Sequence, residues 1–297
     1  MIIVKLEGGH SNQLFQYAAG RCLAHKLGAE LFMDRHWFDT VVDVDTPRFY
    51  ELGGYNIPQK FISQEAFALV EDKQEDVKTR LYKLTKGRRK PRIRHIRQQG
   101  NSFNSEILAL SDNVYLDGWW QDQRYFQDIR SLILKDFELK TKPSKDDAKL
   151  LKEITNSNSI SVHFRREDYV SNKHANKFHG LPNIEYYKRG LKYLADKTGW
   201  REMNLYVFSN DIEWCKKNIN FDYPTAFIGG QEKDRGPRDM RLMKHCKHNL
   251  LANSSFSWWG AWLNQNSDKI IIAPKVWFQD KLANSETEIV PKDWIRL

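Results

Sequence analysis

Short apolar segments alternate with helical segments between residues 159 and 273, and this alternation restricts the chain to a small group of folds. Strands that alternate with helices form parallel sheets, because each connection must return the chain to the same end of the sheet. The second half of the chain is therefore predicted to be α/β, with a parallel sheet covered by helices on both faces. We expect strands at 159–164, 203–208, 225–228, 248–252 and 269–273, and helices at about 184–197, 211–218, 238–246 and 256–265.

The first of these strands leads into the stretch ISVHFRREDYV at 160–170. Its apolar and polar residues alternate at first, which is typical of a half-buried strand. Arg165 and Arg166 follow, and two guanidinium groups at a strand end suit a diphosphate or another compact dianion. His163 and Asp168 could hold the rest of such a ligand. Alternatively, one arginine pairs with a neighbouring carboxylate in an ordinary ion-paired loop.

Polar clusters follow two further strands at their carboxyl ends. The residues are Asn210 and Asp211 after the strand at 203–208, and Ser254, Ser255 and Ser257 after the strand at 248–252. Hydroxyl and free N–H groups at a helix start can complete a phosphate site begun by arginines. Helix capping explains each cluster taken alone. Together with Arg165 and Arg166, however, these clusters make three at the carboxyl ends of strands in one sheet, and this favours a ligand site.

The first half of the chain also opens with a strand and a helix. A strand is expected at 2–6, and Ser11 is expected to cap a helix that Gly28 ends. A polar, proline-containing segment at 141–147 is interpreted as a linker, so we predict two domains, 1–143 and 144–297. Further strands are expected at 29–33 and 114–117, and helices at about 63–76, through the basic run described next, and at about 122–134.

The net charge of +9 is concentrated in one basic run, residues 78–97. This run contains ten Lys or Arg and no acidic residue, and the remaining 37 basic residues are balanced by 38 acidic ones. Such a run suits anionic lipid headgroups, nucleic acid or a phosphorylated substrate. It is also compatible with a solvated face that binds nothing.

Three widely spaced cysteines, Cys22, Cys215 and Cys246, argue against a disulfide framework and favour a reducing compartment. The first residues contain too short an apolar run for a signal peptide, and no segment has the roughly 20 apolar residues of a membrane span. We therefore expect a cytoplasmic protein.

Two groups of residues resemble metal ligands only weakly. Asp43 and Asp45 have the carboxylate spacing of metal-dependent sugar-nucleotide enzymes, but paired aspartates are common in loops. His245, Cys246 and His248 lack the fourth ligand that a closed zinc site needs. We therefore expect no metal.

Five ordered motifs, which span most of the chain, resemble glycosyltransferase family 11, the bacterial α-1,2-fucosyltransferases. The motifs are GGHSNQLFQYAAG at 8–20, GWWQDQRYF at 118–126, SVHFRREDYV at 161–170, YVFSNDIEWCKK at 206–217 and KHNLLANSSFSWWGAWL at 247–263. The resemblance implies a GT-B fold, in which two Rossmann-like domains face a central cleft. It also implies GDP-fucose as a co-substrate, with no cofactor and no metal. The C-terminal domain would hold the nucleotide and the N-terminal domain the acceptor.

The resemblance further implies roles for single residues. Arg165 is similar to the family's diphosphate-binding arginine and His163 to a nucleotide-contacting histidine. Asp239 resembles an aspartate that meets the guanine edge in more distant fucosyltransferases. The full set of predicted nucleotide-binding residues is His163, Arg165, Arg166, Asn210, Asp211, Asp239, Ser254, Ser255 and Ser257.

The expected chemistry is an inverting displacement. A diphosphate leaves readily, so fixed charge at Arg165 can replace both a metal and a general acid, with Arg166 orienting the loop. Asp168 is the nearest candidate for the base, and His10 and Asn12 could orient the acceptor hydroxyl.

The expected reaction moves L-fucose from GDP-β-L-fucose to the 2-hydroxyl of a galactose-terminated oligosaccharide or lipid-linked glycan, as in O-antigen synthesis. One alternative is a related GDP-6-deoxyhexose donor. Another is a polyanion-binding or RNA-binding protein in which the basic run is the active feature. On the enzyme interpretation nucleic acid is not a partner, and the basic run contacts anionic lipid on the inner face of the cytoplasmic membrane.

Overall fold

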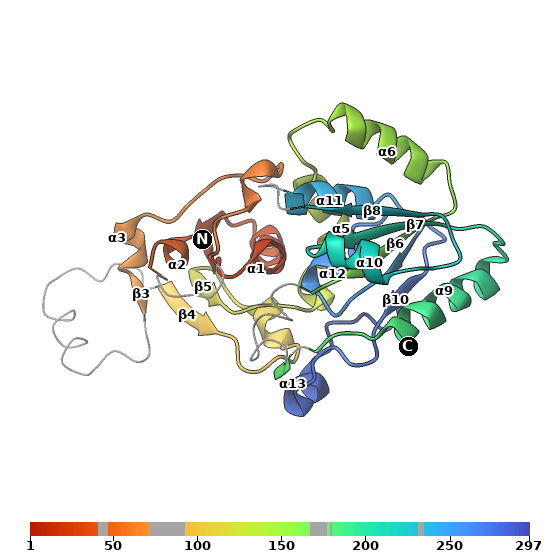
Figure 1. The fold of residues 1–297 in the computed structure, drawn as a ribbon. Helices are drawn as coiled ribbons and strands as arrows, with labels where there is room; N and C mark the ends of the chain where they lie inside the picture. Colours follow the sequence, from red (N-terminus) through yellow and green to blue (C-terminus); the bar gives the residue numbers. More distant parts are fainter. Residues whose placement is uncertain (41–46, 72–92, 167–176, 179, 231–234) are drawn as a thin grey trace, which may run out of the picture. The chain divides into compact units, whose positions relative to one another are not determined.

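The structure, a computed structural model, describes residues 1–40, 47–71, 93–166, 177–178, 180–230 and 235–297 (Figure 1). The chain divides into two compact units, Met1–Glu138 and Leu139–Leu297, called unit 1 and unit 2 below. Each unit contains its own parallel sheet, so the expected α/β class with a sheet in each half is confirmed. The predicted domain boundary at 143–144 lies a few residues beyond this division and stays a prediction.

Unit 1 is built on five parallel strands in the order β2-β1-β5-β4-β3. Their bounds are β1 Ile2–Lys5, β2 Leu31–Asp34, β3 Val70–Glu71, β4 Ile93–Arg97 and β5 Val114–Asp117. The helices are α1 His10–Leu27, α2 His36–Thr40, α3 Gln64–Phe67 and α5 Arg130–Asp136. Short 3-10 turns lie at Leu52–Gly54, Ser105–Ala109, Gln123–Tyr125 and Gln127–Ile129.

Helix α1 follows β1 directly and packs closely against the sheet. A Cβ at Gly20 would lie 3.1 Å from Cβ of Val4, a tight contact that glycine avoids where the helix approaches the strand. Gly28 ends the helix in the left-handed conformation (φ 60°), as predicted. Gly9 is the N-cap residue, and Ser11 lies inside the first turn and is buried, so the prediction that Ser11 caps the helix is wrong.

Three helix predictions in unit 1 are wrong in extent. The helix expected at 63–76 is only α3, because the chain enters β3 at Val70. The helix expected through the basic run is replaced, in its described part, by β4, where Ile93 is buried in a cluster with Ile3 and Tyr115. In place of one helix at 122–134 there are two 3-10 turns followed by α5. Residues 72–92 lie outside the described residues.

Unit 2 is built on six parallel strands in the order β11-β10-β9-β6-β7-β8. Their bounds are β6 Ser159–Phe164, β7 Asn204–Ser209, β8 Thr225–Gly229, β9 His248–Leu250, β10 Ile271–Ala273 and β11 Ile295–Arg296. The five expected strands are therefore confirmed, with ends shifted by up to two residues, and β11 was not expected. Strand β6 lies between β9 and β7 and is buried on both faces, so its expected half-burial is wrong.

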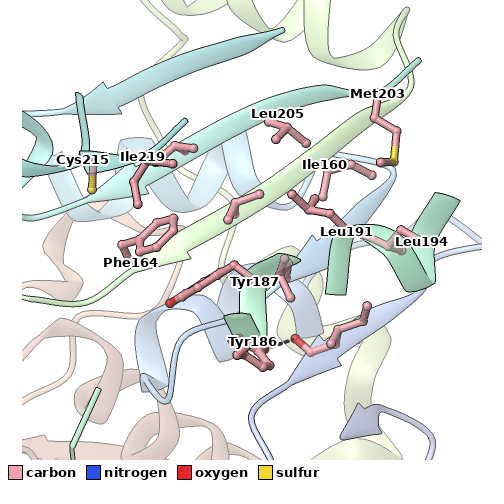
Figure 2. Close-up of a cluster of buried hydrophobic side chains, with 14 residues drawn as sticks. Ile160, Phe164, Tyr186, Tyr187, Leu191, Leu194, Met203, Leu205, Cys215 and Ile219 are labelled. Carbon is pink, nitrogen blue, oxygen red and sulfur yellow. Dashed lines mark hydrogen bonds between the residues drawn. The ribbon is translucent and has the colours of Figure 1, made fainter. Parts of the chain in front are cut away.

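Helices cover both faces of this sheet, as predicted. Figure 2 shows one face, where Ile160 and Phe164 of β6 pack with Tyr187 and Leu191 of α9. On the opposite face, Phe208 of β7 joins a cluster with side chains of α6 and α11. The helices of unit 2 are α6 Lys145–Thr155, α9 Ile184–Thr198, α10 Ile212–Asn218, α11 Arg235–Met243, α12 Ser255–Trp262 and α13 Lys281–Glu286.

Two helices of unit 2 differ from expectation at their starts. The predicted linker at 141–147 becomes helical in its second part, because Ser144 caps α6. Helix α11 begins at Arg235 rather than at 238, because Pro237 falls in its first turn, where no backbone N–H donor is needed. This early start places Arg235 and Asp239 one turn apart on the same helix.

Candidate active site

The strand order of unit 2 reverses beside β6, and this reversal marks where parallel sheets bind ligands. From β6 the chain moves outward through β7 and β8, and then continues on the other side through β9, β10 and β11. In such sheets the loops that leave the two strands at the reversal run apart and border a crevice. Arg165 and Arg166 follow β6, and the segment 251–254 links β9 to α12. The sheet therefore brings two of the predicted clusters to the same edge.

Arg166 is held in place by three neighbours. Its backbone N–H donates to Oδ1 of Asn210 (3.0 Å), and its Nε lies 3.5 Å from Oδ2 of Asp211. Its guanidinium carbon lies 3.4 Å from the centre of the Trp214 ring, a cation–π contact. This geometry ties the end of β6 to the end of β7 and suits the loop-orienting role expected of Arg166. The nucleotide-binding roles of Asn210 and Asp211 stay predictions.

Asp211 and Asn210 also shape the start of α10. The carboxylate of Asp211 caps this helix by accepting from the N–H of Trp214 (3.2 Å), and its own N–H donates to Oγ of Ser209 (3.0 Å). The carboxylate of Asp211 therefore both caps α10 and contacts Arg166. Arg165, next to this locked residue, is half-buried. Its position at the end of a central strand fits the diphosphate-binding role, which stays a prediction.

His163 is the buried polar residue nearest to this strand end. Its side chain is 3% exposed, and its ring lies 5.5 Å from the ring of Phe256 at the start of α12. Burial, together with the positive charge of Arg165, lowers its pKa to about 3, so the imidazole is neutral at pH 7. Its Nδ1 is buried and makes no hydrogen bond within the described residues. A buried ring nitrogen of this kind is available to a ligand.

The serines at the start of α12 serve the fold. Ser254 is the N-cap and accepts from the N–H of Phe256 (3.3 Å), while Ser257 donates to the carbonyls of Ala252 (3.3 Å) and Ser254 (3.2 Å). Ser255, the first residue of the helix, is half-buried. The capping interpretation thus accounts for Ser254 and Ser257, and a phosphate contact by any of the three serines stays a prediction.

Asp239 is a buried carboxylate with one paired and one unpaired oxygen. Nε of Arg235 donates to its Oδ2 (3.0 Å), whereas its Oδ1 is buried and makes no hydrogen bond within the described ranges. Burial raises the pKa of Asp239 to about 6, although Arg235 and Arg238 both lower it and Asp147 adds a small rise. A buried oxygen without a donor is costly, and a ligand that carries N–H groups, such as guanine, would satisfy it.

The predicted acceptor-side residues, His10 and Asn12, belong to unit 1. His10 is 7% exposed, its Nε2 lies 2.7 Å from the hydroxyl of Tyr55, and the two rings stack. Burial lowers the pKa of His10 to about 3, which favours a structural role over proton transfer. Asn12 is half-buried, and its Oδ1 accepts from Nε2 of Gln121 (2.9 Å). The catalytic roles of both residues stay predictions.

Three carboxylates named from the sequence cannot be placed. Asp168, the candidate base, lies outside the described residues, as do Asp43 and Asp45. Among the side chains that the structure does describe, no three His, Cys, Asp or Glu residues gather in a way that could hold a metal ion. The absence of a metal requirement therefore stays a prediction.

Two residues of this region were missed by sequence reasoning. Trp214 supports Arg166 through its ring, and Arg235 pairs with Asp239. The spacing of four residues between Arg235 and Asp239 was a usable signal, because such pairs face each other on a helix. The contact of Trp214 had no comparable signal, since it joins helix α10 to the residue that follows β6, far apart in the sequence.

A family comparison covers most of the chain. The model of "Glycosyl transferase family 11" matches residues 84–297, which includes all of unit 2.

Individual relatives also match, two of them over nearly their full length. An "Alpha-1,2-colitosyltransferase" of Escherichia coli is 31% identical over 100% of this chain and 99% of its own length. The "O-antigen biosynthesis glycosyltransferase WbnK" of Escherichia coli is 29% identical over 98% of this chain and 99% of its own. "Galactoside alpha-(1,2)-fucosyltransferase 2" of Sus scrofa is 26% identical over 50% of this chain and 45% of its own. A solved structure of the NodZ alpha-1,6-fucosyltransferase, 13% identical, covers 88% of this chain and 91% of its own with a TM-score of 0.43.

Proposed function

Because the chain belongs to glycosyl transferase family 11, we propose that it transfers L-fucose from GDP-β-L-fucose to the 2-hydroxyl of a galactose-terminated glycan. The names of its relatives support an α-1,2 linkage and a place in O-antigen synthesis. Membership of a glycosyltransferase family favours this enzyme over the polyanion-binding or RNA-binding alternative.

The observation that carries the proposal is the strand reversal at β6. Arg165 leaves β6 at this point, and the ring of His163 lies beside the start of α12 on the other side of the reversal. A diphosphate there would meet a guanidinium, a neutral imidazole and the N-terminal end of a helix. Asp239 supplies a buried oxygen for the N–H groups of a base. These groups suit a purine nucleoside diphosphate better than they suit a neutral ligand.

The reaction balances as a single displacement. The 2-oxygen of the acceptor forms a bond to the anomeric carbon, the bond from that carbon to the β-phosphate oxygen breaks, and GDP leaves with the electron pair. The acceptor proton passes to a base, for which Asp168 stays the candidate from the sequence. Arg165 stabilises the charge that develops on the diphosphate, so the proposal requires no divalent metal.

The test is release of GDP on mixing the purified protein with GDP-fucose and glycans. We expect release to depend on a galactose-terminated acceptor, and the product to carry an α-1,2-linked fucose by NMR. Transfer of galactose from UDP-galactose, or GDP release that no glycan stimulates, would contradict the proposal.

A second donor is favoured by one specific observation. The 31% identical relative is named a colitosyltransferase, and colitose differs from L-fucose in lacking the 3-hydroxyl. A site that hydrogen-bonds this hydroxyl would reject colitose by as much as about 10⁴-fold, whereas an apolar site would discriminate about 10–200-fold or less. The ratio of kcat/KM for GDP-fucose and GDP-colitose therefore decides between the donors.

The proposal includes peripheral contact with the cytoplasmic face of the inner membrane. None of the helices in the described ranges combines the length and apolar character needed to cross a bilayer. The basic run at 78–97 supplies charge for anionic lipid, and a lipid-linked acceptor would lie at that surface. Co-flotation of the protein with anionic vesicles in a density gradient tests this contact.

A further inference from the structure

Two adjacent tryptophans after β5 differ sharply in burial. Trp120 is fully buried, and its ring meets the edge of Tyr125 at a centroid distance of 5.5 Å. Trp119 is 40% exposed. The backbone of Trp120 is in the left-handed region (φ 51°), which is costly for a bulky side chain and persists only where the surroundings impose it. This turn keeps the indole of Trp119 at the surface.

The turn is imposed by Gln98, which lies directly after β4. Its Oε1 accepts from the backbone N–H of Trp119 (2.7 Å) and from that of Trp120 (2.9 Å). A Cβ at Gly118 would lie 2.5 Å from Cβ of Gln98, so only glycine lets the amide reach this position. The backbone that carries the exposed indole is thus held by a glutamine, a glycine and a residue in the left-handed region.

Amide groups flank this indole. Gly8, in the loop between β1 and α1, shows that the indole and one amide lie close together. A Cβ built at Gly8 would lie 3.0 Å from Cζ3 of Trp119 and 2.9 Å from Nδ2 of Asn12. Both side chains therefore contact the same point of this loop. Gln121 donates to Oδ1 of Asn12 (2.9 Å), and both residues are half-buried. A partly exposed indole on a held backbone therefore lies beside two connected amides in unit 1.

This combination fits a pyranose ring. A sugar ring presents C–H bonds on one face and hydroxyl groups around its rim, so it stacks on an indole while amides bond its hydroxyls. An aromatic residue that is already ordered loses little entropy when it binds, which is typical of residues that dominate recognition.

We propose that Trp119, Asn12 and Gln121 form a subsite for a pyranose ring of the acceptor glycan. The indole stacks on the ring, and the two amides bond its hydroxyls. This inference rests on the proposed function in one respect, because it takes the acceptor to be a glycan.

The first test uses the indole N–H signals of the ¹⁵N-labelled full-length protein. The signal that disappears in Trp119→Phe belongs to Trp119. Titration with N-acetyllactosamine or methyl β-galactoside, without any donor, should shift this signal. No shift with either sugar, or a shift with GDP-fucose alone and not with the sugars, would overturn the assignment to an acceptor. Because no transfer is needed, this result is independent of the donor and of the proposed reaction.

The second test is kinetic and uses matched variants. Trp119→Leu should raise KM for the acceptor about tenfold or more, and Trp119→Phe should raise it less, with KM for the donor sugar nucleotide unchanged. Phe178→Leu is the control, because Phe178 in unit 2 is also 40% exposed. Equal acceptor KM in wild type and Trp119→Leu, or an equal rise in donor KM, would overturn the subsite.

Discussion

Arg235 and Asp239 lie one turn apart on α11 and form a buried ion pair, with Nε of the arginine 3.0 Å from Oδ2 of the aspartate. Side-chain exposure is 13% for Arg235 and 8% for Asp239. Arg238 of the same helix and Asp147 of α6 also act on this carboxylate, the first lowering and the second raising its pKa. Pairing with Arg235 favours the ionised form of Asp239, whereas burial favours its neutral form.

This arrangement predicts a pH dependence of GDP binding. The pKa of Asp239 is about 6, above its ordinary value, so the carboxylate is ionised at pH 7 and becomes protonated as the pH falls through 6. If the ionised form accepts from guanine, the affinity for GDP should fall by up to about tenfold per pH unit below 6. Calorimetric titration with GDP from pH 5 to 8 measures this. Asp239→Asn should bind GDP more weakly and with little change across this range.

Replacement of Arg235 tests the same pH dependence of GDP binding by shifting the pKa of Asp239. Arg235→Gln should raise the pKa of Asp239 further, so GDP affinity should be reduced at pH 7 and should recover at alkaline pH. A purely structural role for Arg235 would give a loss that alkaline pH does not restore. Wild-type affinity that is constant from pH 7 to pH 5 would contradict the assigned contact.

Arg165 should be needed for its shape as well as its charge. Arg165→Lys keeps the positive charge but loses the planar fork, and should cost about 2–4 kcal/mol of transition-state stabilisation. This corresponds to a decrease in kcat/KM of roughly 30- to 900-fold, measured by GDP release. Arg166→Lys is the comparison, since Arg166 contacts Asp211 and Trp214 and should affect folding stability more than turnover. Near-native kcat/KM in Arg165→Lys would remove the diphosphate role.

Transfer should proceed without a divalent metal. Activity is expected to survive excess EDTA, and Asp43→Asn and Asp45→Asn should both remain active, because fixed positive charge takes the place of a metal at the diphosphate. Turnover is measured before and after chelation. Loss of activity that Mn²⁺ or Mg²⁺ restores would show that the mechanism is wrong.

The basic run should bind the protein to anionic lipid. Replacement of Arg88, Arg89, Lys90 and Arg92 by Gln should weaken binding to vesicles that contain phosphatidylglycerol, since each charge near the surface contributes about 1 kcal/mol. Binding should also fall with added salt, because exposed charges are screened over about 8–10 Å. Transfer to a small soluble acceptor should be nearly unchanged. Equal vesicle binding by the variant and the wild type at low salt would exclude the membrane role.

The elements of unit 2 could be predicted because each carries its own local signal. Apolar runs of strand length alternate with helical periodicity, and the carboxyl ends of the strands bear polar residues. The full burial of β6 could not be predicted, since its alternating Ser161 and His163 read as an exposed face. The polar face is buried because helices cover this side of the sheet, with Phe256 of α12 beside His163, and this depends on residues far along the chain.

Some elements of unit 1, by contrast, have no local sequence signal. Strand β4 ends a run of basic residues, and its backbone is extended because it pairs with β3 and β5, which no local pattern reveals. The position of Trp119 depends likewise on Gln98, a residue of a different strand end. The motif at 118–126 drew attention to Trp119, but its contact with Gln98 could be found only in the fold.

The place of β6 in its sheet has a consequence for synthesis of the protein. This strand is the first of unit 2 in the sequence, yet it has neighbours on both sides. After β7 has emerged from the ribosome and before β9 has done so, the chain can pair β6 with β7 but has nothing to place along its other side. The strand that becomes the middle of the domain is then an open, apolar edge. A chain stalled at this stage should require a chaperone and should aggregate without one.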